Sequence, residues 1–589
     1  MQIPILSIII WLPAVSACVN LFIPAHRKTM PKVLVLLTLL LQGVCFIWIL
    51  TQLHTTIAWQ THQPIFDSLY FIEKHRWLHF PLGNMGILSA NYFLGLDGLN
   101  TGLLGLALVV LSIGAIASWS INKYIKAYCI LYLLLNTLII GSLVALDCLL
   151  FYVFFELTLV PIYFLIALWG ETNGPYTATK FFLYTLTGAL LMLVVFIGLG
   201  LSTYDPIATG IQAGIFKGSV LEHTSSEKFR LIQEMVQNNQ IASQDIVHTF
   251  EIPLMTDTQN LIPHTTFSLT NPQSLGKFPM RLWGFCILLI GFMIKLAVAP
   301  LHTWLPGAHV QALTPISIVL AGILLKLGAY GILRTVYSIF PEGAIHFGFW
   351  IGILGILSGM YAALNALAMQ DLKKMVAYAS IAHMGFFLVG IGSLTTEGVQ
   401  GALYQLVSHG LIASLLFLVV DILYARTQNR SIENYSGLAS QMPYYTAITL
   451  LSFAAALGTP GFSTFIAELL ILLGAFESPI YNSVWKMGIG MLAGLSIFLN
   501  ATYYVWTIQR MFGGKFSLRF SAWIPMLKDI QPKEAVLLVA IMLMVILLGV
   551  FPSLLLNLSK DTIKLFVDQI YQVGKAHLEK VIMLHTLIS

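Results

Sequence analysis

Apolar runs of about 20 residues recur along the chain, which is the length that an α-helix needs to cross a bilayer. Turn-forming or charged residues separate successive runs. Transmembrane β-strands would instead alternate apolar and polar residues over segments of about ten residues. The chain is therefore predicted to be an all-α polytopic membrane protein. The runs predict about fourteen transmembrane helices, near residues 3–23, 31–52, 93–118, 127–146, 149–169, 179–201, 282–304, 314–335, 346–369, 375–394, 400–424, 443–472, 484–510 and 534–556.

Basic residues gather in alternate short loops, and this asymmetry predicts the orientation. Short loops rich in Lys and Arg stay on the cytoplasmic side. With an even number of spans, both termini are then expected outside. The basic residues of these loops are Arg27, Lys28, Lys32, Lys123, Lys126, Lys180, Lys373, Lys374, Arg426, Arg430, Arg510, Lys515, Arg519 and Lys528.

Residues 202–280 interrupt the pattern with a long polar segment. Long loops cross the membrane regardless of their charge, so we expect an extracytoplasmic insertion. The sequence SSEKFRLIQEMVQ within it has helical periodicity and a serine that can cap a helix, so the insertion is expected to be partly helical.

The proline-containing runs near 282–304 and 443–472 are five spans apart, and an odd offset gives them opposite orientations in the membrane. Inverted-topology repeats with one broken helix in each half have this arrangement. We therefore expect two inverted five-helix repeats. The predicted parts are three N-terminal helices in 1–126, a first repeat in 127–335 that contains the insertion, a second repeat in 336–510, and a C-terminal helix and tail in 511–589.

The amino-acid composition limits the kinds of cofactor site that this chain is expected to hold. Of the 589 residues 58% are hydrophobic and 9% are charged, whereas soluble proteins carry about 25% charged residues. The five cysteines form no CxxC pair, and no glycine-rich nucleotide motif is present. We therefore expect this chain to hold no iron–sulfur cluster, no metal and no nucleotide.

Two ionisable residues lie in the middle of apolar runs, Glu156 and Lys295, and each is followed five residues later by a proline, Pro161 or Pro300. A charge in the bilayer centre costs about 2.5–3.5 kcal/mol on insertion scales, so it faces protein or a water-filled cavity and usually has a function. Proline frees backbone groups that only protein or water can satisfy. The two residues are candidates for a proton path, and the alternative is a static structural ion pair.

Lys326 and Glu468 lie in further apolar runs. Lys326 is too far from either end of its helix for its ammonium group to reach the interface easily. We interpret it as a second proton carrier, next to Lys295. Glu468 is interpreted as the acid of the second repeat, and the alternative is a packing carboxylate held by the hydroxyls of Ser463 and Thr464.

Four histidines lie within or at the end of these runs. His383 and His409 are candidates for a relay, because histidine titrates near neutral pH, and the alternative is a neutral, hydrogen-bonded core histidine. His302 and His309 are seven residues apart with no carboxylate partner, which favours a proton entrance or packing over a metal site. Asp97 precedes a predicted helix and is interpreted as a helix cap.

Several of these runs, taken in order, resemble the antiporter-like subunits of proton-pumping NADH:quinone oxidoreductase, which is respiratory complex I. The similar segments are FFELTLVPIYFLIALWG, PLHTWLPGAHV, TPISIVLAGILLKLGAYGILR, QDLKKMVAYASIAHMGF, SHGLIASLLFL and GTPGFSTFIAE. The resemblance covers most of residues 90–550. It is nearest to subunit M, called chain 4 in mitochondria, because the sister chains usually have lysine at position 468. The short end expected after residue 556 also argues against the sister chain with a long lateral C-terminal helix.

The resemblance implies a proton-translocating membrane-arm subunit that couples quinone reduction to proton pumping. NADH, FMN, iron–sulfur clusters and quinone are then expected in partner subunits. The partners would include the sister antiporter-like chains, and no nucleic-acid partner is expected. The residues that match the family's relay are Glu156 and Lys295 as a coupled ion pair, Lys326 as the central lysine, His383 and His409 as relay histidines, and Glu468 as the terminal acid.

Two departures concern the inner mouth, since many relatives have Asp where this chain has Gly307 and Glu where it has Gln311. The insertion is also longer than in organelle relatives, which favours a bacterial inner membrane. Two alternatives are a subunit of a multisubunit sodium/proton antiporter and a subunit of a membrane-bound hydrogenase-type complex. Glu468 argues against the antiporter, whose chains usually have lysine there.

Overall fold

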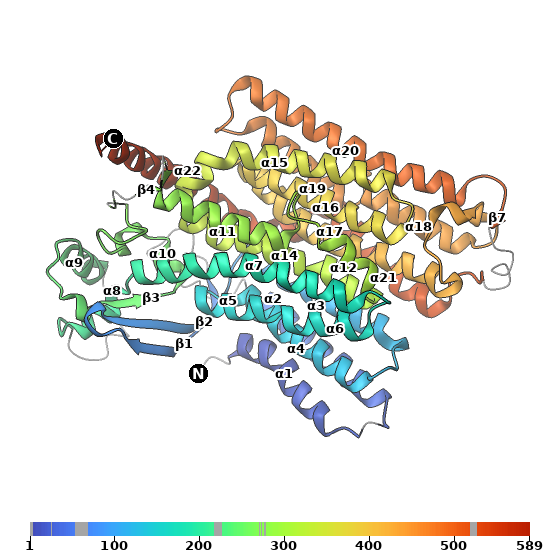
Figure 1. The fold of residues 1–589 in the computed structure, drawn as a ribbon, viewed down its shortest axis with the longest axis horizontal. Helices are drawn as coiled ribbons and strands as arrows, with labels where there is room; N and C mark the ends of the chain where they lie inside the picture. The colour runs from blue at the N-terminus through green and yellow to red at the C-terminus, as the bar shows by residue number, and fades with distance from the viewer. Residues whose placement is uncertain are drawn as a thin grey trace.

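Long apolar helices form the body of the protein, as the hydrophobic runs predict (Figure 1). The computed structural model describes residues 4–24, 26–53, 69–216, 226–269, 271, 274–275, 278–518 and 527–588. Within these residues, twelve helical segments are long and apolar enough to cross a membrane. Three of them consist of consecutive pieces: Thr101–Ser120, which begins with α3 (Thr101–Ala117), Cys148–Trp169 and Thr314–Tyr337. The others are α1 (Ile5–Phe22), α2 (Thr29–Gln52), α4 (Ile125–Val144), α7 (Gly174–Ser202), α15 (Pro341–Ala368), α16 (Leu372–Gly392), α17 (Thr396–Thr427), α20 (Ser483–Phe512) and α21 (Pro532–Val550).

The fold class is confirmed, because the chain is a polytopic helical membrane protein. Two further predicted spans are broken into pieces that are each too short to cross alone. One consists of α11 (Met280–Leu296) and α12 (Leu305–Gln311), and the other of α18 (Pro443–Ala456) and α19 (Ser463–Glu477). The number of fourteen spans, the inverted repeats and the boundaries of the four parts stay predictions.

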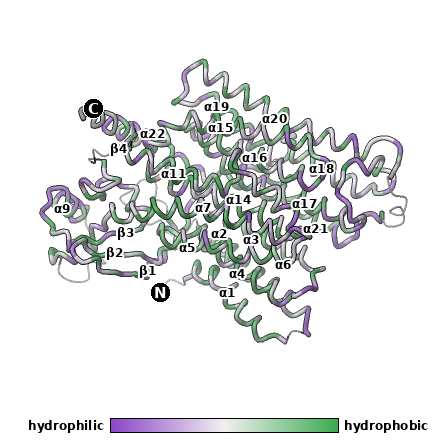
Figure 2. The backbone as a smooth tube through the Cα atoms, in the orientation of Figure 1, coloured by the Kyte–Doolittle hydropathy of each residue, from purple (hydrophilic) through white to green (hydrophobic). Residues whose placement is uncertain are grey.

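The helices differ in how deeply they are buried. Figure 2 shows apolar residues along the bundle and hydrophilic residues at its ends. The segment Thr314–Tyr337 is entirely buried, whereas only 22% of α21 is buried within this chain. A polar residue on the first segment therefore contacts protein on all sides.

Helices in the core are interrupted beside the charged residues. α5 (Cys148–Leu157) and α6 (Leu159–Trp169) meet at Thr158, because Pro161 has no N–H and its ring clashes with the carbonyl four residues earlier. The segment Thr314–Tyr337 alternates α13 (Thr314–Val319) and α14 (Leu325–Gly331) with π-helical stretches at Leu320–Leu324 and Ile332–Tyr337. Such π-bulges are frequent at functional sites.

A small lobe lies at the end of the bundle toward which both termini point (Figure 1). Strands β1 (Tyr70–Pro81) and β2 (Ile87–Leu96) form an antiparallel hairpin, and β3 (Val247–Thr249) pairs in parallel with β2. The insertion adds α8 (Pro206–Gln212) and α9 (Ser226–Gln237), so it is partly helical as expected. The hairpin was not predicted, and it ties the insertion to the chain before α3.

A buried carboxylate on the hairpin caps the first transmembrane helix. Glu73 Oε1 accepts a hydrogen bond from the Leu6 N–H at 2.8 Å, and its Oε2 accepts from the Ser7 N–H at 3.1 Å. The free N–H groups of a helix N-terminus need such acceptors, and a negative charge there is stabilised by the helix dipole. The hairpin and α1 are therefore joined by their polar groups as well as by packing.

The end of the chain differs from the expected short tail. Residues Ser553–Ile588 form one helix, α22, which packs against α15, α17 and α3. The expectation of a short end after residue 556 was wrong, because α22 has polar residues along one face and so gives no apolar run. An amphipathic helix that lies against protein needs only one apolar stripe.

Candidate functional site

Six ionisable side chains predicted from the sequence lie in the middle of the bundle, each on a different helix. Five are buried and Glu156 is half-buried. They are Glu156 on α5, Lys295 on α11, Lys326 on α14, His383 on α16, His409 on α17 and Glu468 on α19. The structure brings some of them into direct contact and leaves others apart.

Lys326 and His409 are in contact at the centre of the row. Lys326 Nζ lies 2.6 Å from His409 Nδ1 and donates a hydrogen bond to the Ala321 carbonyl at 2.5 Å. The π-helical register explains the second contact, because the Leu325 N–H bonds to the Leu320 carbonyl five residues earlier. In an α-helix it would bond to Ala321. The irregular helix thus presents a backbone acceptor to the buried ammonium group.

The two relay histidines are neighbours. The ring centroids of His383 and His409 are 5.2 Å apart, and His383 Nδ1 lies 2.9 Å from Gln405 Nε2. Sequence reasoning missed Gln405, although it lies one helical turn before His409 on α17. Lys326, His409 and His383 therefore form a continuous polar path through the core.

Lys295 and Glu156 lie near each other without a direct salt bridge. Lys295 Nζ donates to Thr158 Oγ1 at 3.1 Å and to the Phe155 carbonyl at 3.5 Å, and it lies 4.4 Å from the centre of the Phe155 ring. Within the described part of the chain, the Glu156 Oε2 atom has no hydrogen-bond partner. The two charges still interact electrostatically. Thr158, at the break between α5 and α6, is the side chain to which Lys295 donates, and it lies two residues after Glu156.

Glu468 lies beside the break between α18 and α19. Its carboxylate is packed against Gly458, which adopts the left-handed conformation with φ of +72°. Ser463 and Thr464 do not hold it, since both hydroxyls bond to Ser408 Oγ, at 2.7 and 3.1 Å. The alternative that these hydroxyls fix the carboxylate was wrong, because they face α17.

A second buried ion pair was missed. Arg334 Nη2 lies 2.7 Å from Asp97 Oδ1, and both side chains are 0% exposed. Asp97 Oδ1 also accepts from the Leu99 and Asn100 N–H groups at 3.0 and 3.2 Å, both in the turn before α3. The prediction of a helix cap was wrong in this respect, because the N-cap of α3 is Asn100 and Asp97 holds the preceding turn. Arg334 lies one residue before the end of the predicted span 314–335, so its position did not mark it as a charge in the middle of an apolar run.

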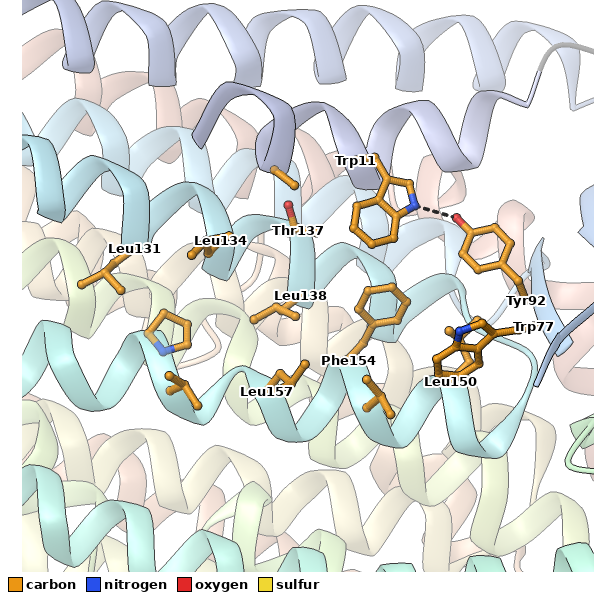
Figure 3. Close-up of a pocket in the computed structure, with 14 residues that line it drawn as sticks. Trp11, Trp77, Tyr92, Leu131, Leu134, Thr137, Leu138, Leu150, Phe154 and Leu157 are labelled. Atoms are coloured by element: carbon orange, nitrogen blue, oxygen red, sulfur yellow. Dashed lines mark hydrogen bonds between the residues drawn. The ribbon is translucent and has the colours of Figure 1, made fainter. Parts of the chain in front are cut away.

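A groove of about 430 Å³ lies on the side of the bundle next to the Glu156 helix (Figure 3). Apolar side chains such as Leu131, Leu138 and Leu157 line it, and Trp11 Nε1 donates to Tyr92 Oη at 3.1 Å at one end. None of the six charged residues lines this groove. It is therefore separate from the polar row.

The fold and the row define a class of protein. Buried charges on broken helices in the centre of a helical membrane bundle are typical of proteins that move ions. Comparison with known proteins gives the family. The model described as "NADH:quinone oxidoreductase/Mrp antiporter, TM" matches residues 145–205 and 250–496. The chain belongs to this family.

Relatives that are similar over nearly the whole chain agree with this. The NADH-quinone oxidoreductase subunit M of Rickettsia felis is 32% identical over 566 residues, which are 96% of this chain and 99% of that protein. A chain of respiratory complex I from Thermus thermophilus superimposes with a TM-score of 0.68 at 26% identity, covering 95% of this chain and 99% of that one. A chain of the Mrp complex of Dietzia sp. has the same TM-score at 16% identity, covering 98% and 100%, which shows a shared fold.

Proposed function

We propose that this chain is the subunit M of a NADH:quinone oxidoreductase and that it moves protons across the membrane. The observation that carries the proposal is the contact of Lys326 with His409, next to His383, in the core of the bundle. Three titratable groups in contact away from lipid are suited to pass a proton from one to the next. The Rickettsia and Thermus proteins supply the assignment to a complex.

The proposed cycle begins at Lys295 and Glu156. Their interaction is indirect, so a small movement at Thr158 changes how strongly the two charges stabilise each other. A carboxylate that approaches the ammonium group favours its charged form, and one that withdraws favours proton release. The released proton passes to Lys326, then to His409 and His383, and leaves by way of Glu468.

The energy for this movement comes from outside the chain. NADH, FMN, iron–sulfur clusters and quinone belong to partner subunits in this proposal, and the sister antiporter-like chains are its membrane neighbours. The basic loops face the cytoplasm of a bacterium, and both termini lie outside the inner membrane. The Mrp-like fold keeps a sodium/proton antiporter as the second candidate.

Reconstituted complex provides the test. The whole complex, with wild-type chain or with Lys326→Ala, is placed in liposomes, and NADH oxidation and proton uptake are recorded together. We expect Lys326→Ala to lower the number of protons moved per NADH while the complex still assembles. Unchanged pumping in Lys326→Ala would contradict the relay. Sodium-dependent proton exchange without NADH would support the antiporter instead.

A further inference from the structure

The proposed relay needs a group that takes up protons at the end of the bundle where the basic loops lie. The short helix α12 lies at this end and carries no carboxylate, with Gly307 and Gln311 among its residues. It comes shortly before Thr314–Tyr337, the segment that carries Lys326, and we call this end of the two elements the mouth. We infer that Asp421 on α17 is the carboxylate that takes up protons at this mouth. The inference rests on the proposed function and adds a residue to it.

Asp421 is placed between the mouth and the core. It lies six residues before the end of α17 at Thr427, a distance of about 9 Å at 1.5 Å per residue. Its side chain is half-buried, so water from this face reaches it. Asp421 Oδ1 accepts a hydrogen bond from Thr314 Oγ1 at 2.5 Å. Thr314 begins α13, the first piece of the segment that carries Lys326.

A buried lysine lies near Asp421, where α16 begins beside the end of α17. Lys373 interacts electrostatically with Asp421, and its Nζ donates to the Ala312 carbonyl at 2.7 Å, at the end of α12. The sequence interpretation placed Lys373 in a loop as a topology signal, whereas it is buried in the first turn of α16. Glu534 also interacts electrostatically with Asp421, so the Asp421 carboxylate has one cation and one further acid near it.

His309 connects this end to the relay. Its ring is completely buried and stacks on Phe417, 4.7 Å between centroids, one helical turn before Asp421 on α17. Neither ring nitrogen has a hydrogen-bond partner within the described residues. It interacts electrostatically with both Lys373 and Lys326. A buried polar group without a partner calls for an explanation, and a water molecule in transit between Asp421 and Lys326 provides one.

A purely structural role is the competing explanation. Asp421 would then only balance the charge of Lys373 and hold Thr314 at the start of α13. That role needs a hydrogen-bond acceptor or a fixed charge, but it does not need a proton carrier. Asp421→Asn tests the hydrogen-bonding part of the structural role, because the amide oxygen still accepts from Thr314 while the side chain no longer takes up a proton at neutral pH. A carboxylate restored at another position of the mouth, as in Gly307→Asp, then tests whether position 421 itself must carry the charge.

The experiment uses the whole complex in liposomes, with NADH oxidation and proton uptake measured side by side. We expect Asp421→Asn to lower protons moved per NADH to the level of Lys326→Ala, and Asp421→Glu to restore them. Gly307→Asp in the Asp421→Asn background should also restore pumping. A β-carbon at Gly307 has only Thr177 Cγ2 near it, at 3.7 Å, which is ordinary van der Waals contact. The matched control is Glu433→Gln, an exposed acid beyond the end of α17.

The outcomes separate this inference from the proposed function. If Lys326→Ala abolishes pumping and Asp421→Asn leaves it intact, Asp421 is not the entrance and only this inference is overturned. If both variants pump normally, the proposed function is wrong as well. A loss of pumping in Asp421→Asn that Gly307→Asp does not restore would make Asp421 structural and overturn the inference.

Discussion

The buried pair of Asp97 and Arg334 gives the sharpest prediction about stability. Asp97→Asn keeps an oxygen that accepts from the Leu99 and Asn100 N–H groups, so the turn before α3 retains its acceptor. The guanidinium of Arg334, 0% exposed, loses its counter-ion. Removing one partner of a buried ion pair costs about 3–5 kcal/mol, because the remaining charge stays in a poorly solvating interior. Most of that cost is expected here.

Thermal inactivation at a fixed temperature is the suitable assay, since large membrane proteins unfold irreversibly and their rate of unfolding decides survival. A factor of ten in rate corresponds to about 1.4 kcal/mol. If the pair is already broken in the transition state, Asp97→Asn speeds inactivation by about 100-fold to a few thousand-fold. Glu433→Gln, an exposed acid, serves as control and should change the rate little.

The double variant Asp97→Asn, Arg334→Met tests whether the unpaired charge of Arg334 causes the faster inactivation of Asp97→Asn. Replacing a buried ion pair by apolar groups of similar volume is often neutral or stabilising. We therefore expect the double variant to inactivate more slowly than Asp97→Asn alone. If the two substitutions add, so that the double variant is the least stable, the ion pair is not what stabilises this region and the reasoning fails.

Two further predictions concern Gly458 and His248. A β-carbon at Gly458 would overlap Glu468 Oε2, and φ of +72° is strained by about 1–2 kcal/mol for other residues. Gly458→Ala should therefore reduce proton pumping in liposomes by displacing the carboxylate, and normal pumping would contradict this. In the small lobe, burial lowers the pKa of His248 below 6.5. The folded lobe then binds fewer protons than the unfolded one, so its stability is full above pH 6.5 and is lost as the pH falls further. Limited proteolysis of the lobe should be faster at pH 5 than at pH 7.5, and His248→Gln should remove the difference.

The pattern of apolar runs predicts the helical bundle well, because a backbone that crosses a bilayer can adopt few conformations. Every N–H and C=O in the hydrocarbon region needs an internal partner, so a long apolar run is a helix. The same reasoning finds Lys326 and Glu468, since a charge in such a run stands out. Reasoning from the sequence fails for elements that contain no long apolar run. The hairpin of β1 and β2 depends on pairing with β3, about 160 residues later in the chain, and α22 has only one apolar face.

The contacts within the site could not be predicted for a related reason. Arg334 and Asp97 are 237 residues apart, and Lys326 and His409 are 83 apart. One sequence shows that each residue is buried but not which helices pack together. The indirect contact of Lys295 with Glu156 depends on where Thr158 lies when Pro161 breaks the helix. A sequence does not define that position to within a few ångströms.

The backbone at Gly328 limits how the lysine helices can move. A β-carbon there would lie 2.9 Å from both the Leu296 nitrogen and the Phe292 oxygen, so α14 and α11 touch at the level of the main chain. Gly328 is two residues from Lys326, and the contact lies next to Lys295. Because interiors are close-packed, the helices cannot approach further, and separating them would leave a void. For the proposed transfer of a proton between the lysines, we therefore expect side chains to move while these two helices stay together. Thr158, which Lys295 contacts at the break between α5 and α6, is the candidate for that movement.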